Sequence, residues 1–433
     1  MYKHSVRIDR RKCVGCTNCI KTCPTEAIRV QKGKAMILDD RCIDCGNCLT
    51  ACPHDAMVSV TTPFNVLNDF KYNIVIPSAA LASQFRNLTN LEDMYEGLYS
   101  MGFDAIYEEA KAAEIIAEAT RRHLRSGDAV FPLIDCSCPV VPRLVTALFP
   151  NLIDHLTPFV SPTEAAARIA KAEFCEKRSV PIEEVGAYYV TPCAAKMTHI
   201  KNPMGVSSSD INGVFPVRDV YAKMIPLMGA GGKRRSIEHP AGAGGIESAA
   251  IGGWSAAVGT KHYLAVDGIS NIIACLEEID NERLTELLLL EAMACPGGCV
   301  GGPLVFENQF VARNRNHRIA NSLPRLDPSA DEHIQKYADS PMLRYDKEFE
   351  PRNILQLSEN VVEAIRMMER LEQINKSLPG LDCGSCGSPS CRTLAEDIVK
   401  GQAVEMDCIF KLRDKVRQMA QEMVDLASAE KRG

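Results

Sequence analysis

Short apolar runs alternate with amphipathic stretches from residue 73 to about residue 325. The apolar runs predict buried strands at 73–77, 105–107, 129–134, 187–190 and 263–266. Between them, segments such as 108–124 and 162–177 repeat apolar residues at helical spacing. Strands that alternate with helices predict an α/β fold with largely parallel sheets. In such sheets, functional residues gather beyond the ends of the strands.

Composition narrows the class of protein. The 433 residues carry a net charge of −6, which gives no indication of nucleic-acid binding. No apolar run reaches the length of a membrane span, and residues 1–9 contain neither an apolar leader nor a twin arginine, so a cytoplasmic location is predicted. The 19 cysteines form tight groups, which favours metal thiolates over disulfides in a chain of this length.

The pattern Cys-x2-Cys-x2-Cys-x3-Cys-Pro occurs twice between residues 13 and 53. This spacing is typical of bacterial two-cluster ferredoxins, in which the fourth cysteine of each run binds the other cluster. One 4Fe-4S cluster is therefore predicted on Cys13, Cys16, Cys19 and Cys52, and a second on Cys42, Cys45, Cys48 and Cys23. Zinc or disulfides are the alternative. Because cysteines fill every ligand position, the predicted role is electron transfer.

Three further cysteine segments follow predicted strands of the α/β region. They are Cys-Ser-Cys-Pro at 136–139, Thr-Pro-Cys-Ala-Ala-Lys at 191–196 and Met-Ala-Cys-Pro-Gly-Gly-Cys at 293–299. The Pro-Gly-Gly turn in the third lets the backbone approach a bulky inorganic centre. A single loop cysteine is usually a small apolar residue, but three such segments behind a two-cluster run indicate a metal centre.

These segments are similar, in order, to the three signature segments of FeFe hydrogenases. The third, Glu-Ala-Met-Ala-Cys-Pro-Gly-Gly-Cys-Val-Gly-Gly at 291–302, matches almost completely; the second keeps Pro-Cys-x-x-Lys and the first only Cys-Pro. The resemblance implies an H-cluster, which is a 4Fe-4S cubane bridged by one cysteine to a diiron unit with CO, cyanide and a dithiolate. By motif position, the cubane ligands would be Cys138, Cys193, Cys295 and the bridging Cys299.

The resemblance also assigns roles to two other residues. Lys196 would donate a hydrogen bond to a diiron cyanide, and Met293 would pack beside the bridging carbonyl. The alternatives are a surface charge for Lys196 and an ordinary core side chain for Met293.

Two positions depart from the catalytic pattern of that family. Ser137 stands where catalytic members have the cysteine that passes protons to the dithiolate, and Ala112 stands where they have the second relay glutamate. Glu109 fits the first relay glutamate. Because one acid–base residue typically contributes about 10²–10⁴-fold in rate, the substitutions predict slow turnover. Slow turnover is expected of a sensor, or of an enzyme with another proton route.

The C-terminal region carries a fourth cysteine group, Cys383, Cys386, Cys391 and Cys408. It predicts another 4Fe-4S cluster, with zinc as the alternative, and resembles the cluster domain of the sensory branch of FeFe hydrogenases, here without a PAS domain. Apolar residues spaced 4, 3, 4, 3 from 412 to 426 form a short heptad seam. That helix either packs on its own domain or contacts a second copy or a signalling partner. A second amphipathic helix is expected at 354–375.

Together these patterns predict three domains: a two-cluster ferredoxin-like domain at 1–60, an H-cluster domain at 61–376 and a helical iron–sulfur domain at 377–433. The predicted function is a slow FeFe hydrogenase that interconverts H2 with protons and electrons and senses hydrogen or redox state. It would use three accessory 4Fe-4S clusters and a ferredoxin-like or other redox partner, with neither nucleic acid nor membrane as a partner. The alternative is an electron-transfer or iron–sulfur scaffold protein on the same fold, without the diiron unit.

Overall fold

The computed structural model describes residues 3–88, 90–228, 236–352, 354 and 356–430. The chain forms two compact units. The larger comprises Met1–Val6, Ile43–Gly46 and Ser59–Arg352, and the smaller comprises Arg7–Cys42, Asn47–Val58 and Asn353–Gly433. The division into three domains drawn from the sequence stays a prediction, because contact grouping does not test it.

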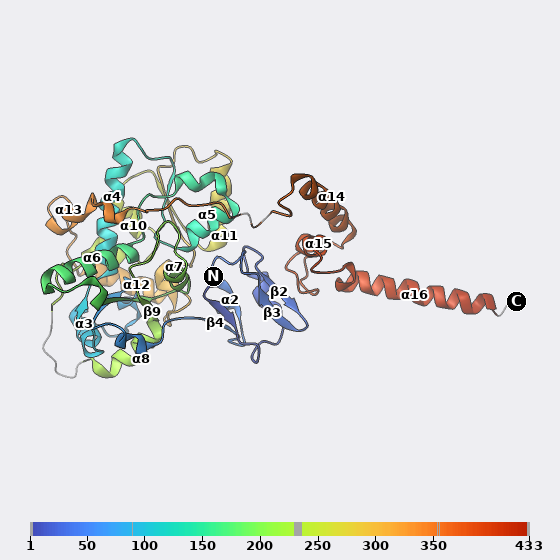
Figure 1. Ribbon diagram of the computed structural model, residues 1–433, viewed down its shortest axis with the longest axis horizontal. Coiled ribbons are helices and arrows are strands. Elements are labelled where there is room, and N and C mark those ends of the chain that lie inside the picture. The colour runs from blue at the N-terminus through green and yellow to red at the C-terminus, as the bar shows by residue number, and fades with distance from the viewer. Residues whose placement is uncertain (1–2, 89, 229–235, 353, 355, 431–433) are drawn as a thin grey trace. The chain divides into compact units, whose positions relative to one another are not determined.

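The larger unit contains a four-stranded parallel sheet in the order β6-β5-β8-β9. The edge strand β9 is labelled in Figure 1. Its strands are β5 (Tyr72–Pro77), β6 (Ala105–Ile106), β8 (Val185–Thr191) and β9 (Gly213–Pro216). All seven residues of β8 are buried, as expected for a strand covered on both faces. The strands predicted at 73–77, 105–107 and 187–190 are thus confirmed, and so is the parallel α/β class.

A second parallel sheet has the order β10-β11-β7, with β7 (Leu133–Ile134), β10 (Tyr263–Asp267) and β11 (Leu289–Met293). The strand predicted at 129–134 is wrong for its first four residues. Val130 and Phe131 are exposed, and Pro132 has no N–H to donate to a neighbouring strand. Only Leu133 and Ile134 pair, against Leu289 and Leu290 of β11.

Helices surround these sheets, and α4 (Glu109–Ser126) packs on α6 (Pro162–Arg178). Ser161 caps α6 by accepting a hydrogen bond from the Glu164 N–H, and Pro162 occupies the first turn. The other helices of this unit are α3 (Leu91–Ser100), α5 (Val140–Leu148), α7 (Ala195–Lys201), α8 (Val217–Met224), α9 (Ala243–Glu247), α10 (Gly253–Val258), α11 (Ile269–Asp280), α12 (Gln309–Asn321) and α13 (Glu332–Ala338).

The smaller unit joins the N-terminal cysteine runs to the C-terminal segment. Its elements are α1 (Asn18–Lys21), the antiparallel hairpin β2 (Ile28–Gln31) and β3 (Lys34–Ile37), α2 (Asn47–Ala51), α14 (Val361–Ser377), α15 (Cys391–Val399) and α16 (Ile409–Glu430). Val30 N donates to Gly387 O at 2.8 Å, which ties the C-terminal segment to the hairpin. β1 (Val6–Ile8) pairs with β4 (Met57–Ser59) in a sheet of two strands.

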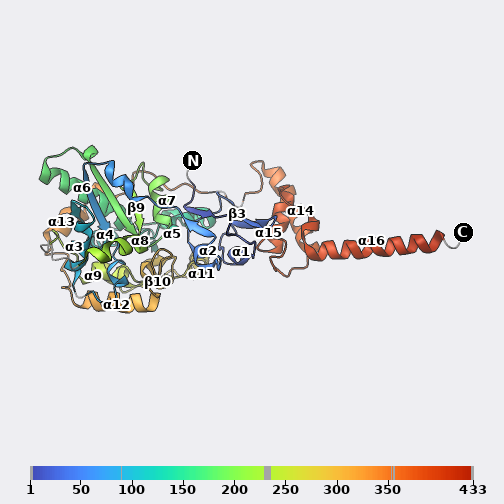
Figure 2. The ribbon, with the colours of Figure 1, turned by 90° about the horizontal axis from the view of Figure 1, so that it is seen from below.

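The structure revises the sequence prediction for one C-terminal helix, α14, and adds detail for a second, α16. The helix expected at 354–375 begins only at Val361, where Asn360 caps it; residue 355 lies outside the described residues. α16 runs on as one straight helix (Figure 2). Leu412, Val416, Met419 and Met423 of its seam are exposed, so the seam does not pack on its own unit. No helix among the described residues is long and apolar enough to cross a membrane.

Candidate metal and active centre

The carboxyl ends of three strands bring the core cysteine segments together. Cys138 follows β7, Cys193 follows β8, and Cys295 follows β11 with one residue between. A cavity opens at this point. It is lined by Ala79, Glu109, Ser137, Cys138, Pro162, Lys196, Ser248, Ala249, Trp254, Met293 and Cys299. Segments more than 150 residues apart along the chain therefore meet at one site.

The four core thiols lie close enough for their charges to interact. Burial raises the pKa of Cys193 to about 11, although Lys196 opposes the shift, and Cys138 raises it further. Burial likewise raises the pKa of Cys295, with Cys193, Cys138 and Cys299 adding to it. Buried thiols of this kind become thiolates when a cation binds them. The donor set therefore fits an iron–sulfur cubane.

Gly298 makes room beside this set. Its φ of +96° is a conformation that residues with a side chain rarely adopt. A Cβ there would lie 2.7 Å from Met293 Sδ and 2.8 Å from Ala249 O. Glycine is thus required for the chain to turn between Cys295 and Cys299, as the Pro-Gly-Gly motif suggested.

Lys196 is a buried cation rather than a surface charge. Its Nζ lies 2.8 Å from Glu109 Oε1, also contacts Thr163 Oγ1, and sits 4.9 Å from the ring centre of Tyr189. Burial lowers the lysine pKa, but Glu109, Cys299 and Cys193 raise it above its usual value overall. Lys196 therefore stays charged at the wall of the cavity.

Glu109 is held as the anionic partner. Its carboxylate accepts hydrogen bonds from Tyr189 Oη at 2.9 Å, Ala79 N at 3.2 Å and the Thr163 hydroxyl. Burial raises its pKa, but Lys196 and the other donors lower it below the usual value overall. Of these donors, the sequence indicated only Lys196. Thr163 and Tyr189 were missed because residues 54 and 80 positions away give no local spacing signal.

Ser137 also faces the cavity and is bound to an aspartate that the sequence interpretation missed. Its hydroxyl donates to Asp135 Oδ1 at 2.8 Å, and its backbone N–H donates to the same oxygen at 3.0 Å. Asp135 is fully buried, and burial raises its pKa to about 7. Its place directly beyond β7 was the available signal. The neighbouring Cys136 lies in the apolar cluster beside Val140 and Leu144 and does not line the cavity.

The first ferredoxin-like group lies within the smaller unit. Burial raises the pKa of Cys19 to about 11, and Cys16, Cys13 and Cys52 each add to the shift, so these four cysteines are neighbours. Of the second group, Cys23, Cys42 and Cys48 lie in the smaller unit and Cys45 in the larger. Cys45 is close enough to Cys295 for their charges to interact.

The C-terminal group gathers around a small apolar cluster in the smaller unit. Cys383 and Cys408 both raise the pKa of Cys386, after burial, which is the largest cause. Cys386, Cys391 and Cys408 all pack against Leu394 and its neighbours. The structure thus brings the four cysteines from 383 to 408 to one end of α15.

Comparison with known families agrees with this geometry. The model of the iron only hydrogenase large subunit, C-terminal domain, matches residues 71–231 and 233–303. The chain therefore belongs to the iron-only hydrogenase large subunit family. A 4Fe-4S dicluster domain matches residues 5–53, and an Fe-S cluster family matches residues 378–410.

Individual relatives are distant. The chain is 27% identical over 376 residues to the periplasmic [Fe] hydrogenase large subunit of Nitratidesulfovibrio vulgaris, covering 72% of this chain and 89% of that protein. It is 27% identical to iron hydrogenase 1 of Clostridium pasteurianum, covering 69% of this chain and 64% of that protein. A solved variant of apo [FeFe]-hydrogenase HydA1 from Chlamydomonas reinhardtii shares the fold, with a TM-score of 0.50, 13% identity and coverage of 66% and 95%.

Proposed function

We propose that this protein interconverts H2 with protons and electrons slowly, at an H-cluster, and that it acts as a sensor of hydrogen or redox state. The single observation that carries the proposal is the cavity in which a buried, charged Lys196 and Met293 meet Cys299 and Cys138. An electron-transfer protein needs only the cluster cysteines. Lys196 is paired with Glu109, and its ammonium group has three N–H donors, so it can also donate to an anionic ligand in the cavity.

The residues fit the group that the family would supply. Cys138, Cys193, Cys295 and Cys299 would hold the cubane, with Cys299 as the bridge to the diiron unit. When bound, that group would supply the site at which H2 is split or formed. Lys196 would donate its charged N–H to a cyanide, sharing its protons between that ligand and Glu109. Met293 would exclude water from the carbonyl side.

Proton delivery is the step at which this chain departs from a fast enzyme. A serine hydroxyl gives up its proton far less readily than a thiol, and Ser137 is already committed to Asp135. Ala112 is fully buried and carries no proton. Protons would therefore have to pass through Asp135 or through water, which supports slow turnover.

Electrons would reach the site through the accessory clusters. Cys45 and Cys295 are close enough for their charges to interact. If Cys45 holds the second ferredoxin-like cluster and Cys295 the cubane, this proximity supports electron transfer between the two clusters. The redox partner is proposed to be ferredoxin-like, and the location cytoplasmic.

Infrared spectroscopy of the protein after maturation tests the proposal. We expect CO and cyanide bands, which Cys299→Ser removes while the accessory clusters remain visible by electron paramagnetic resonance. Cys175→Ser is the matched control, because Cys175 lies on α6 outside every cysteine group. Bands absent from the fully matured wild-type protein would instead identify an iron–sulfur scaffold without the diiron unit.

The cluster at the C-terminal group has its own test. Cys383→Ser should lower the iron content by about four atoms per chain while the CO bands persist. An unchanged iron content would show that Cys383, Cys386, Cys391 and Cys408 do not bind a 4Fe-4S cluster.

A further inference from the structure

Two histidines and a glutamate meet in the larger unit, outside the cavity described above. One ligand atom from each of Glu173, His239 and His333 lies within 4.8 Å of the other two. Glu173 lies on α6, His333 on α13, and His239 in the chain that precedes α9. None of the three lines the cavity of the cysteine site.

The three side chains are in direct contact. His333 Nε2 lies 2.9 Å from Glu173 Oε1, and the two imidazoles stack with ring centres 3.9 Å apart. Two charged imidazoles would repel at that separation. The neutral imidazole is the form that binds metals.

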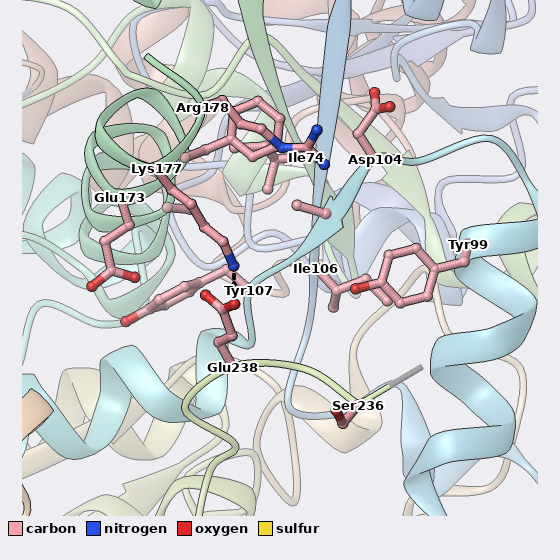
Figure 3. Close-up of a pocket in the computed structure, with 13 residues that line it drawn as sticks. Ile74, Tyr99, Asp104, Ile106, Tyr107, Glu173, Lys177, Arg178, Ser236 and Glu238 are labelled. Carbon is pink, nitrogen blue, oxygen red and sulfur yellow. Dashed lines mark hydrogen bonds and ion pairs between the residues drawn. The ribbon is translucent and has the colours of Figure 1, made fainter. Parts of the chain in front are cut away.

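Two buried polar atoms near the three side chains have no hydrogen-bond partner among the described residues. His333 is buried, and its Nδ1 has no hydrogen-bond partner among the described residues. The hydroxyl of Tyr107 is likewise buried and unpartnered there. Figure 3 shows Tyr107 beside the Glu173 carboxylate, and this carboxylate is among the charges that raise the pKa of Tyr107, after burial. Buried polar atoms are almost always satisfied, so the unpartnered Tyr107 hydroxyl beside the Glu173 carboxylate points to a further group at this place.

The surroundings suit a divalent cation. The pocket in Figure 3 opens beside Glu173 and Tyr107 and is also lined by Glu238 and Lys177, which pair with each other. Lys336 Nζ is 3.9 Å from Glu173 Oε1, but its side chain is 55% exposed and free to turn into solvent. His239 is exposed, so an ion could enter from that side.

We propose that Glu173, His239 and His333 form a zinc site, with water in the fourth position. Two imidazoles and one carboxylate are a donor set that zinc takes, and a fourth, open position is typical of such three-ligand sites. Tyr107 would hydrogen-bond to the bound water or to Glu173. The ion would link α6, α13 and the chain before α9, three segments that the sequence places far apart.

The test uses the cluster-loaded protein, so that the iron-binding cysteines are occupied. The protein is treated with a chelator, incubated with Zn²⁺, and passed over a desalting column; zinc and iron are then measured by mass spectrometry. We expect about one zinc per wild-type chain and none in His239→Asn, with equal iron in both. Asn is a suitable replacement, because residue 239 has φ of +51°, a conformation that asparagine tolerates.

His317→Asn is the matched control, since His317 is an exposed histidine on α12 outside the cluster, and this variant should keep its zinc. Anomalous diffraction at the zinc edge should place the ion between the three side chains. Equal zinc in wild type and His239→Asn, no zinc in wild type, or an anomalous peak elsewhere would each overturn the proposal. None of these outcomes bears on the hydrogenase proposal, because the readout is zinc and not activity.

Discussion

A buried ion pair in the smaller unit fastens the C-terminal cysteine group to the ferredoxin-like hairpin. Arg29 Nε lies 2.5 Å from Asp397 Oδ2, and Arg29 Nη2 lies 3.0 Å from Oδ1, so the contact is bidentate. The side chains are only 4% and 8% exposed. Asp397 also accepts from Ser388 Oγ, which lies in the loop between Cys386 and Cys391. The pair therefore fixes the loop that carries cluster ligands.

The substitution Asp397→Asn keeps the size of the side chain and removes its charge. The guanidinium of Arg29 would keep its bonds to Glu26 O and Ile28 O but lose its counter-charge in a buried place. Removing one partner of a buried pair typically costs about 3–5 kcal/mol. An exposed pair supplies the matched control: Arg392 and Glu372 are 57% and 43% exposed, and Glu372→Gln should cost about 0–1 kcal/mol.

Hydrogen exchange followed by mass spectrometry is the suitable assay, because cluster loss makes global unfolding irreversible. Asp397→Asn should speed exchange in α15 and in the hairpin β2–β3 by about 10²–10³-fold, at 1.4 kcal/mol for each factor of ten. Glu372→Gln should change it by less than about tenfold.

A double variant separates the effect of the unpaired charge from the effect of the changed side-chain packing. Arg29→Met with Asp397→Leu leaves no unpaired charge, so it should exchange more slowly than Asp397→Asn alone. Exchange in α15 that is unchanged by Asp397→Asn would refute the reasoning. If the double variant exchanged as fast as Asp397→Asn, packing and not charge would hold the two segments together.

Three further predictions follow from other sites. Ser137→Cys should raise hydrogen evolution about 10²-fold at matched CO-band intensity, and an unchanged rate would show that proton delivery at this position is not limiting. Deleting residues 411–433 should convert a dimer to a monomer in sedimentation, whereas a monomeric full-length chain would refute pairing through α16. Burial raises the pKa of Glu114 to about 7, above its usual value, so the folded state holds an extra proton and loses about 3 kcal/mol of stability as pH rises from 4.5 to 7. Glu114→Gln should flatten the pH dependence of hydrogen exchange in α4, and an unchanged dependence would contradict this assignment.

The cysteine groups were readable from the sequence because their geometry is local. Cys13, Cys16 and Cys19 lie within one short loop and helix, and the motif itself predicted that Cys52 would join them. Strand ends supplied the rest, since Cys138 and Cys193 stand just beyond buried apolar runs. Ligands that lie close together along the chain can therefore be recognised from the spacing of the residues.

Contacts between distant segments left no such pattern. Arg29 and Asp397 are 368 residues apart, and Glu173 and His333 are 160 apart. In the sequence, each of these residues has the pattern of an ordinary charged or polar position on an amphipathic element. Only packing shows that each is buried and where its partner lies. The false strand at 129–132 has the opposite cause: an apolar run was taken as buried, although Val130 and Phe131 face solvent.

The structure also shows which of the two replaced proton-relay residues can be changed back to the family's residue. From the sequence, Ala112→Glu is as natural a repair as Ser137→Cys. Ala112, however, is fully buried in the apolar cluster that includes Ile115, Ile116 and Trp254. A carboxyl group there would need space that a packed core lacks and would be buried without a partner, which costs several kcal/mol. Ser137 instead faces the cavity, where a thiol replaces a hydroxyl with little change in volume. The interruption at Ala112 is thus built into the core packing of α4, and the gain expected of Ser137→Cys relies on protons that pass through Asp135 or water rather than along the route that the family motif suggests.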